Sequence, residues 1–393
     1  MTTTATFSTQ RVDPYNPPAD HRRLQQEENP ISQVQLTDGR TLWAVTKHAD
    51  VRAVLGDARF SSDRALPGHP MNRGGYGGSA AKLKQLIEMD PPEHTQQRVR
   101  VMGEFTVKKI AAMRPRIVEI VESTIDAMLA SGSEADLVTA LSLPVPSVVI
   151  AELLGVPYED HDFFQVNSAT FVEADATMEQ RIEAMGNLKA YIGDLVASRV
   201  ERPGEDILSR QLAGGADVEE LTGLGFLLLI AGHETTANMI SLSVATLLDR
   251  PDLLQQLRDD PTLVPGAVEE LLRYFTIAEV GHQRLATADI EVDGTLIREG
   301  EGVYALANVA NRDPEVFSEP DTIDFTRGAR NHVAFGFGPH QCLGQNLARL
   351  ELEIVLEAVV RRLPTLRLAV PFRDIAFKEH GPNYGVYSLP VAW

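Results

Sequence analysis

An apolar pattern of helical period runs from about Val218 to Leu248, which is far longer than the average helix of a globular protein. Asp217 precedes the pattern and Glu220 lies three residues further on, so the sequence predicts a capping box at the start of the helix. Few places in a globular protein accommodate a helix of this length. A buried helix along the axis of the molecule is one of them, and we predict that arrangement.

The middle of this helical pattern holds a glycine followed by polar residues, in the segment 231–236. Glycine destabilises a helix interior by about 1 kcal/mol, and glutamate is almost never fully buried without a partner. Read alone, Gly232 and Glu234 fit either a helix that passes through the protein surface or a functional site inside the protein.

The only cysteine of the chain, Cys342, stands in a glycine-rich string that leads directly into a helical pattern over 343–363. A turn of this kind can leave backbone N–H groups free to point at sulfur, and the following helix presents its positive end there. Read alone, a lone cysteine is most often a small buried apolar residue. The string around it is Phe335-Gly336-Phe337-Gly338-Pro339-His340-Gln341-Cys342-Leu343-Gly344.

This string resembles the haem-ligand signature of the cytochrome P450 monooxygenases, Phe-Gly-x-Gly-x-His-x-Cys-Leu-Gly. The resemblance implies that Cys342 is the thiolate ligand of the iron in haem b, which is iron protoporphyrin IX. It also implies that Phe335 lies against the sulfur and that backbone N–H groups of the turn, which contains Gly336 and Gly344, hydrogen-bond to it. The helix over 343–363 would pack on the proximal face of the haem.

The string Ala-Gly-His-Glu-Thr-Thr at 231–236 resembles the oxygen-activation motif of the same family. By that resemblance the helix is locally opened beside Ala231 and Gly232, where dioxygen binds. Thr235 would provide a hydrogen bond at the oxygen site, and Glu234 would relay protons to it from water.

Haem carries two propionates, which need cationic partners. His94 and Arg98 are four residues apart, so they share a helix face, and they resemble the His-x-x-x-Arg pair of soluble family members. Arg284 and His340 match the other two propionate contacts. Each of these residues alone is more often a surface charge, but four in this order form a coherent set.

Glu270 and Arg273 lie three apart on one helix face, a spacing that is common on solvated helices. At this distance before Cys342 they match the Glu-x-x-Arg pair of the family. That pair is structural, and it connects its helix to a later loop, which contributes a basic residue as the third member of the cluster. We expect Arg327 to be that residue.

Two Asp-Gly pairs each lie between short runs rich in β-formers and therefore predict hairpins. Elsewhere the apolar period is helical, so the sequence predicts a mainly α fold with small β-sheets (α+β). The resemblance covers essentially the whole chain, and it implies one domain over 1–393 with the triangular P450 fold and a long axial helix over the haem. The paired runs are 31–36 with 41–45, and 290–292 with 295–297, followed by 303–306 as a third strand.

The net charge of −19 argues against nucleic acid as a partner, because phosphate binding needs a basic surface. One cysteine allows no intrachain disulfide and fits a reducing compartment. The amino terminus does not read as a secretory signal, and the most apolar run, 224–231, is too short to span a bilayer. We expect a cytoplasmic monomer that does not associate with a membrane.

No further cysteines and no spare residues are present for a flavin or iron–sulfur domain, so electrons must come from a separate protein. We expect a ferredoxin, docked by a local basic patch on the proximal side. The candidate residues are Arg100, Lys108, Lys109, Arg330 and Arg349.

We expect the substrate to be a medium-to-large, mostly apolar small molecule, such as a natural product, macrolide, sterol or xenobiotic. No charged residue plainly demands a particular substrate group, although Arg73 and Glu279 are candidates. The glycine-rich loop 61–90 predicts an adaptable entrance. The other predicted pocket walls are the region 163–188, Leu229, Ile277, Ala278 and Asn383.

Three functions compete at this stage. The first is a monooxygenase that inserts one oxygen atom into a C–H bond or an alkene. The second is a haem-thiolate protein that does not use dioxygen, such as a peroxygenase or a dehydrating isomerase. The third is a haem-based gas sensor, which would normally need an output domain. The presence of both Glu234 and Thr235 favours the first.

Overall fold

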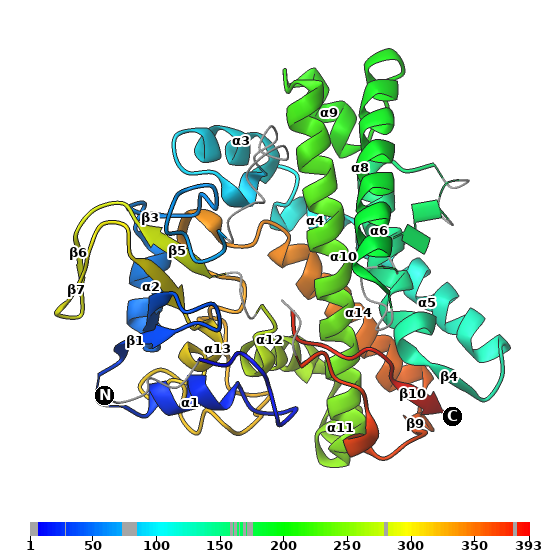
Figure 1. Ribbon diagram of the computed structural model, residues 1–393. Helices are drawn as coiled ribbons and strands as arrows, with labels where there is room; N and C mark the ends of the chain where they lie inside the picture. Colours follow the sequence, from blue (N-terminus) through cyan, green and yellow to red (C-terminus); the bar gives the residue numbers. More distant parts are fainter. Residues whose placement is uncertain are drawn as a thin grey trace. The chain divides into compact units, whose positions relative to one another are not determined.

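The structure is a computed structural model that describes residues 7–27, 29–72, 85–157, 160, 163–164, 166–167, 170, 176–278, 282–379 and 383–393. It is mainly α-helical with small sheets (Figure 1), as predicted. The chain divides into two compact units. Unit 1 comprises Met1–Gln96, Gly266–Leu343 and Lys378–Tyr384, and unit 2 comprises Gln97–Pro265, Gly344–Phe377 and Gly385–Trp393.

Unit 1 is built on a sheet that has five strands in the described part of the chain, in the order β1-β2-β8-β5-β3. Strands β2 and β8 are parallel, and the other neighbours are antiparallel. The hairpin predicted at Asp38-Gly39 is confirmed, because β1 and β2 pair there and Gly39 takes a φ of +84°. The strands are β1 Ile31–Gln35, β2 Thr41–Val45, β3 Phe60–Ser61, β5 Gln283–Ala286 and β8 Gly302–Ala305.

The second predicted hairpin is also confirmed, since β6 (Ile290–Val292) pairs with β7 (Thr295–Ile297). Asp293 and Gly294 both take positive φ values, of 43° and 74°, as a tight hairpin turn requires. The expected third strand exists as β8, but its predicted pairing with this hairpin is wrong. All four residues of β8 are buried, and a strand buried in this way is stabilised between two neighbours, here β2 and β5.

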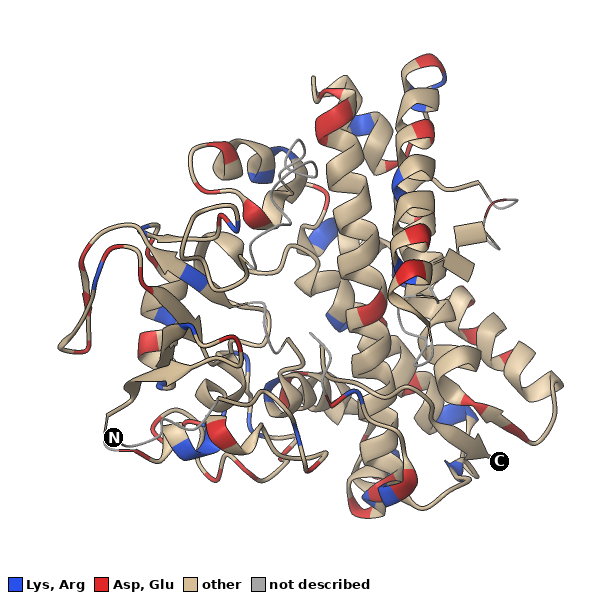
Figure 2. Ribbon diagram, in the orientation of Figure 1, with Lys and Arg blue, Asp and Glu red and all other residues tan. Residues whose placement is uncertain are grey.

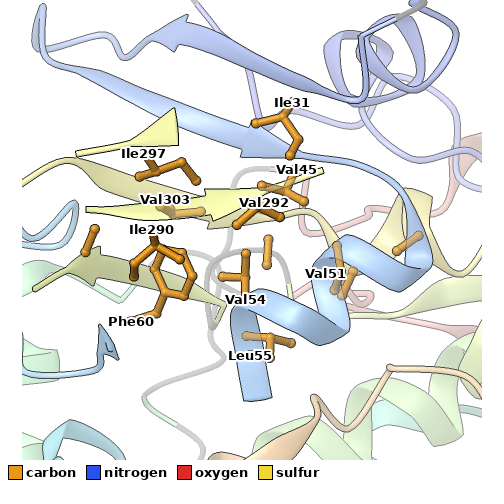
Figure 3. Packing of buried hydrophobic residues seen from close by; sticks show 14 of the residues in the cluster. Ile31, Val45, Val51, Val54, Leu55, Phe60, Ile290, Val292, Ile297 and Val303 are labelled. Atoms are coloured by element: carbon orange, nitrogen blue, oxygen red, sulfur yellow. The ribbon is translucent and has the colours of Figure 1, made fainter. Parts of the chain in front are cut away.

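The main apolar core of unit 1 lies between the strands and α2 (His48–Gly56). Val51, Val54 and Leu55 recur at helical spacing on α2 and are 3% exposed or less. Figure 3 shows these side chains turned toward residues of the sheet and of the β6–β7 hairpin, among them Val45 and Ile290. Each such burial contributes roughly 1.5–3 kcal/mol, so this cluster fixes the sheet on the helix. The other helical segments of unit 1 are α1 Ala19–Gln25, η1 Leu86–Glu88, α13 Ala307–Ala310 and η5 Gly338–His340.

Unit 2 is helical and is organised around α10 (Val218–Asp249), which packs against α6, α8, α9 and α14. The predicted long helix is therefore confirmed. Glu234 is its one charged residue between Glu220 and Asp249. Most of the α10 ribbon is accordingly tan in Figure 2, which colours charged residues red and blue. The other helices are α4 Val107–Ala112, α5 Arg114–Ala130, α6 Pro144–Leu154, α8 Met178–Glu201, α9 Ile207–Ala213, α11 Pro251–Asp259 and α14 Gln345–Arg362, with the short segments η2 Val138–Ser142, η4 Pro261–Leu263 and η6 Phe372–Asp374.

A small sheet of unit 2 has the order β4-β10-β9 within the described residues, formed by Glu134–Asp136, Pro390–Ala392 and Arg367–Leu368. Two further helices, α3 (Glu93–Met102) and α12 (Val264–Phe275), contain the points where the chain passes from one unit to the other. No helix in the described ranges is long and apolar enough to cross a membrane.

The start of α10 shows how the predicted capping box is realised. Asp217 accepts a hydrogen bond from the Glu220 N–H at 2.8 Å, which satisfies one unpaired donor of the first turn. The Glu220 carboxylate accepts both of its 3.0 Å bonds from Nη1 of Arg100. The Asp217 half of the predicted capping box is therefore formed, whereas the Glu220 side chain binds Arg100 and ties α10 to α3.

Candidate active site

The loop that carries Cys342 lies in unit 1 and is closed by its own backbone. The Cys342 N–H donates to Phe335 O at 2.8 Å, and the Gly336 N–H donates to Val333 O at 2.9 Å. The Gln341 N–H donates to Gly338 O at 3.0 Å. These bonds fold 333–342 into a compact turn, and the cysteine at its end is exposed.

Two glycines of this loop are required by its geometry. Gly336 and Gly338 both take a φ of +71°, in the left-handed region that other residues rarely adopt. A Cβ on Gly338 would also lie 2.5 Å from the carbonyl oxygen of Leu55, so the loop passes directly against the end of α2. The Arg52 guanidinium of α2 stacks over the Phe337 ring at 4.2 Å and holds the same face.

The structure brings three of the predicted propionate contacts together in unit 1. The His94 and His340 rings lie 4.0 Å apart, although the residues are distant in sequence. Arg284 and His340 line one small pocket together with Asp90. Arg98 follows His94 by one helical turn on α3.

Arg284 is a buried cation in this group. Burial lowers the pKa of Arg284 to about 10, against the opposing attraction of Asp90. The guanidinium therefore stays charged at neutral pH, and the Gln283 carbonyl oxygen accepts from its Nη1 at 2.8 Å. A buried cation is stabilised by an anion that can reach it, so a carboxylate ligand fits this pocket.

The Glu270 and Arg273 side chains are fully buried and form a bidentate pair with two N–H···O bonds of 2.8 Å. Arg327 donates from Nε to Glu270 Oε1 at 3.0 Å, so the structure places it as the second basic residue on this carboxylate. Arg273 also donates to the Asn311 carbonyl at 2.7 Å. Removing one partner of such a buried pair typically costs about 3–5 kcal/mol, so this cluster fixes α12 to the segments that follow it.

The polar motif of α10 lies in unit 2, on the less buried side of the helix. Ala231 is exposed, and Glu234 and Thr235 are half-buried. The structure differs from the expected local opening, because α10 is unbroken from Val218 to Asp249. The Thr235 hydroxyl donates to Ala231 O at 2.7 Å, so the carbonyl expected at the opening also accepts a side-chain hydrogen bond.

One predicted pocket residue of α10, Leu229, lies on a more buried face of the helix than Ala231. Leu229 is fully buried in unit 2, whereas Leu227 and Leu228 are half-buried. Leu229 precedes Ala231 by two residues, which turns it about 200° around the helix from Ala231. Leu228 and Leu227, at three and four residues from Ala231, share its face and are further pocket candidates beside Leu229.

Glu351 of α14 is a buried acid that sequence reasoning missed. Burial raises the pKa of Glu351 to about 8, against the opposing effect of a hydrogen bond with the Thr236 side chain. The signal in the sequence was a carboxylate within the apolar stripe of a helix, between the buried Leu350 and Ile354. Glu351 therefore joins α14 to α10 one residue after Thr235.

The remaining pocket candidates come together in unit 1. Ala278 and Asn383 form an antiparallel bridge, and the Tyr384 N–H donates to Ile277 O at 2.8 Å. Arg73 and Glu279 lie outside the described residues, as do most of the predicted entrance loop and part of 163–188.

Comparison with known proteins identifies relatives over the whole chain. A family model described as Cytochrome P450 matches residues 206–369. The chain is 48% identical over 392 residues to vitamin D3 dihydroxylase of Streptomyces griseolus, covering 98% of this chain and 96% of the relative. It is 49% identical to pentalenic acid synthase of Streptomyces avermitilis, over 98% and 97% of the two chains. The crystal structure of cytochrome P450 MoxA from Nonomuraea recticatena superposes with a TM-score of 0.94 at 50% identity, over 99% and 98% of the two chains.

Proposed function

The chain belongs to the cytochrome P450 monooxygenases, and we propose that it hydroxylates or epoxidises a medium-to-large, mostly apolar small molecule with dioxygen and electrons from a ferredoxin. The observation that carries the proposal is the closed loop at 333–342, which presents the exposed thiol of Cys342. Full-length relatives that include vitamin D3 dihydroxylase support the substrate class.

The family implies a haem-iron cofactor, and we propose haem b with Cys342 as its iron ligand. When bound, the haem supplies the iron that activates dioxygen. The residues of unit 1 fit such a group, because a thiol stands exposed and the buried cation Arg284 needs an anionic partner such as a propionate. We assign His94, Arg98 and His340 to the propionates as well, and Gly336 and Gly344 to the turn that shapes the thiolate environment.

On α10, we propose that Thr235 and Glu234 move protons to the oxygen site. The Thr235 hydroxyl donates to Ala231 O in this structure, and a rotation about χ1 frees it to donate elsewhere. Glu234 is the one charged group in the middle of α10 and is half-buried, so it can exchange protons with water on one side. We propose Ala231 and Gly232 as the small residues beside the oxygen site.

The substrate proposal rests on the apolar positions near the motif. Leu227 and Leu228 lie on the same face of α10 as Ala231, and Ile277 and Ala278 are half-buried in unit 1. We propose these four residues, together with Asn383, as substrate contacts. Apolar walls of this kind orient a substrate mainly by shape, with few polar contacts.

We also propose that the whole chain acts as one cytoplasmic domain and that it is a monomer.

We propose a purely structural role for the Glu270–Arg273–Arg327 cluster, because Arg273 and Arg327 both donate hydrogen bonds to the Glu270 carboxylate.

The ligand assignment is tested with Cys342→Ser. We expect the purified wild-type protein to bind haem and to give a thiolate-type absorption band in its ferrous–carbonyl complex, while Cys342→Ser loses that band. Serine keeps the size of the side chain but provides no thiolate. Product formation from an apolar substrate should require both dioxygen and reduced ferredoxin. Retention of the thiolate band by the serine variant would refute the assignment.

The proton assignment is tested with Thr235→Ala. We expect this variant to bind haem and substrate normally but to release most of its electrons as peroxide, because oxygen is reduced without controlled proton delivery. The matched control is Thr222→Ala, which removes an equivalent hydroxyl bond to Val218 O on the same helix. Peroxide and product are measured per NADPH consumed in the reconstituted system. Tight coupling in Thr235→Ala would contradict the assignment.

A further inference from the structure

Helix α12 carries two consecutive carboxylates that have different partners. Glu270 is bound by Arg273 and Arg327, as described above. Glu269 instead lies 3.1 Å from Nε2 of His332, a residue at the start of the cysteine loop. The His332 and Glu269 side chains are only 1% and 9% exposed, so this contact lies in the interior of unit 1.

The hydrogen bonds of His332 define its protonation. The Ala334 N–H donates to Nδ1 at 3.2 Å, so Nδ1 must carry a lone pair. The ring proton is then on Nε2, which donates it to the Glu269 carboxylate. The imidazole of His332 thus connects a carboxylate of α12 to the backbone of the loop.

This connection reaches the residues that close the loop around the thiol. The His332 ring lies 5.9 Å from the Phe335 ring at an interplanar angle of 42°. Phe335 O in turn accepts the N–H of Cys342 at 2.8 Å. The intervening Val333 N–H donates to Asn311 Oδ1 at 2.8 Å, so side chains fix the backbone at Val333 and at Ala334.

We propose that Glu269 and His332 are positioning residues for Cys342: the carboxylate orients the imidazole, and the imidazole holds the incoming arm of the loop at Ala334 and Phe335. Without that arm, the Phe335 carbonyl that anchors Cys342 is free to move. The sulfur is then held less firmly in the position from which it would bind iron, so a smaller share of the haem-loaded protein keeps thiolate-type ligation. This inference rests on the proposed role of Cys342 as the iron ligand.

Three substitutions separate positioning from simple packing. Glu269→Gln keeps an oxygen that accepts from Nε2, so it should preserve the loop. Glu269→Leu is similar in size but removes the acceptor. His332→Phe keeps a ring against Phe335 but removes both hydrogen bonds. The control is His21→Phe, since His21 is also a buried histidine of unit 1, bonded to Asn308 at 3.1 Å and stacked on Phe7.

The experiment records the ferrous–carbonyl absorption spectrum of each haem-loaded protein, together with its thermal unfolding. We expect Glu269→Leu and His332→Phe to raise the ratio of thiol-type to thiolate-type band about fivefold, the factor that one net hydrogen bond represents. Glu269→Gln should stay close to the wild type. His21→Phe should lower the unfolding temperature without changing the ratio.

Two other outcomes have distinct meanings. If Glu269→Leu and His332→Phe unfold at a lower temperature but keep the wild-type band ratio, the pair is only a packing contact and the inference is wrong. If the wild-type protein itself shows no thiolate-type band, the ligand assignment of Cys342 fails, and that failure is separate from the behaviour of the variants.

Discussion

Burial is the largest cause of the shifted pKa values of Arg284 and Glu351, and its consequences for charge are opposite in the two side chains. The pKa of Arg284 is lowered to about 10, which leaves the guanidinium charged at neutral pH. The pKa of Glu351 is raised to about 8, so this carboxyl group is mostly protonated at pH 7. Arg284 is thus charged in a pocket that an anionic ligand fits, whereas Glu351 is mostly neutral at the contact between α14 and α10.

Glu351 makes the stability of the protein depend on pH. In the unfolded chain this carboxyl group ionises with the ordinary glutamate pKa of 4.5, whereas the folded protein holds the proton up to about pH 8. The unfolded state therefore binds fewer protons between these values, and the free energy of unfolding falls as pH rises through this window. For the wild-type protein, we expect Glu351 to lower the free energy of unfolding by roughly 4 kcal/mol between pH 5 and pH 8. Glu351→Gln should not show this decrease.

This expectation is checked by thermal or urea unfolding of the haem-loaded protein across that pH range. The control is Glu353→Gln on the same helix, whose carboxylate pairs with Arg114 at 2.9 Å and is partly exposed. Glu353→Gln should keep the wild-type slope. An unchanged slope in Glu351→Gln would mean that Glu351 is ionised in the folded state.

At the scale of elements, sequence motifs predicted the structure correctly where the conformation of a segment depends only on residues close to it in the chain. The Asp-Gly turns and the Asp217 cap depend on backbone conformation within a few residues, and the hairpins and the start of α10 formed as predicted. The pairing of β8 failed because strand partners are chosen by burial across the whole unit. The orientation of Leu229 followed from helical geometry once the exposed face of α10 was known.

The candidate site shows the same division. The positions of Cys342 and of Glu270 with Arg273 could be taken from motifs, because these motifs are short and contiguous. Glu269 and His332, the proposed positioning residues of Cys342, come from segments far apart in the sequence and give no local signal. Pairwise packing of this kind is visible only in the folded chain.

At the scale of the whole molecule, the proposed function requires that a net charge of −19 coexist with a binding surface for an acidic ferredoxin. Two members of the predicted basic patch are already paired in unit 2, since Arg100 contacts Glu220 and Lys109 contacts Glu104. Lys108 is exposed on α4, and Arg349 lies on α14, which packs against α4. A hydrogen bond of 2.9 Å from Asn346 to the carbonyl of Phe105 fixes the starts of these two helices to each other.

We propose that Lys108 and Arg349, which lie on two helices fixed to each other, carry the electrostatic attraction to ferredoxin. The double variant Lys108→Glu/Arg349→Glu should raise the KM for ferredoxin about fivefold at low salt, and this difference should shrink as salt screens exposed charges. The control is Arg298→Glu, an exposed arginine of unit 1 that should leave the KM unchanged. The carbonyl spectrum and substrate binding should be the same in all three proteins, because these side chains are not among the proposed haem, proton-transfer or substrate contacts. A double variant with wild-type KM at every salt concentration would place the ferredoxin on a different surface.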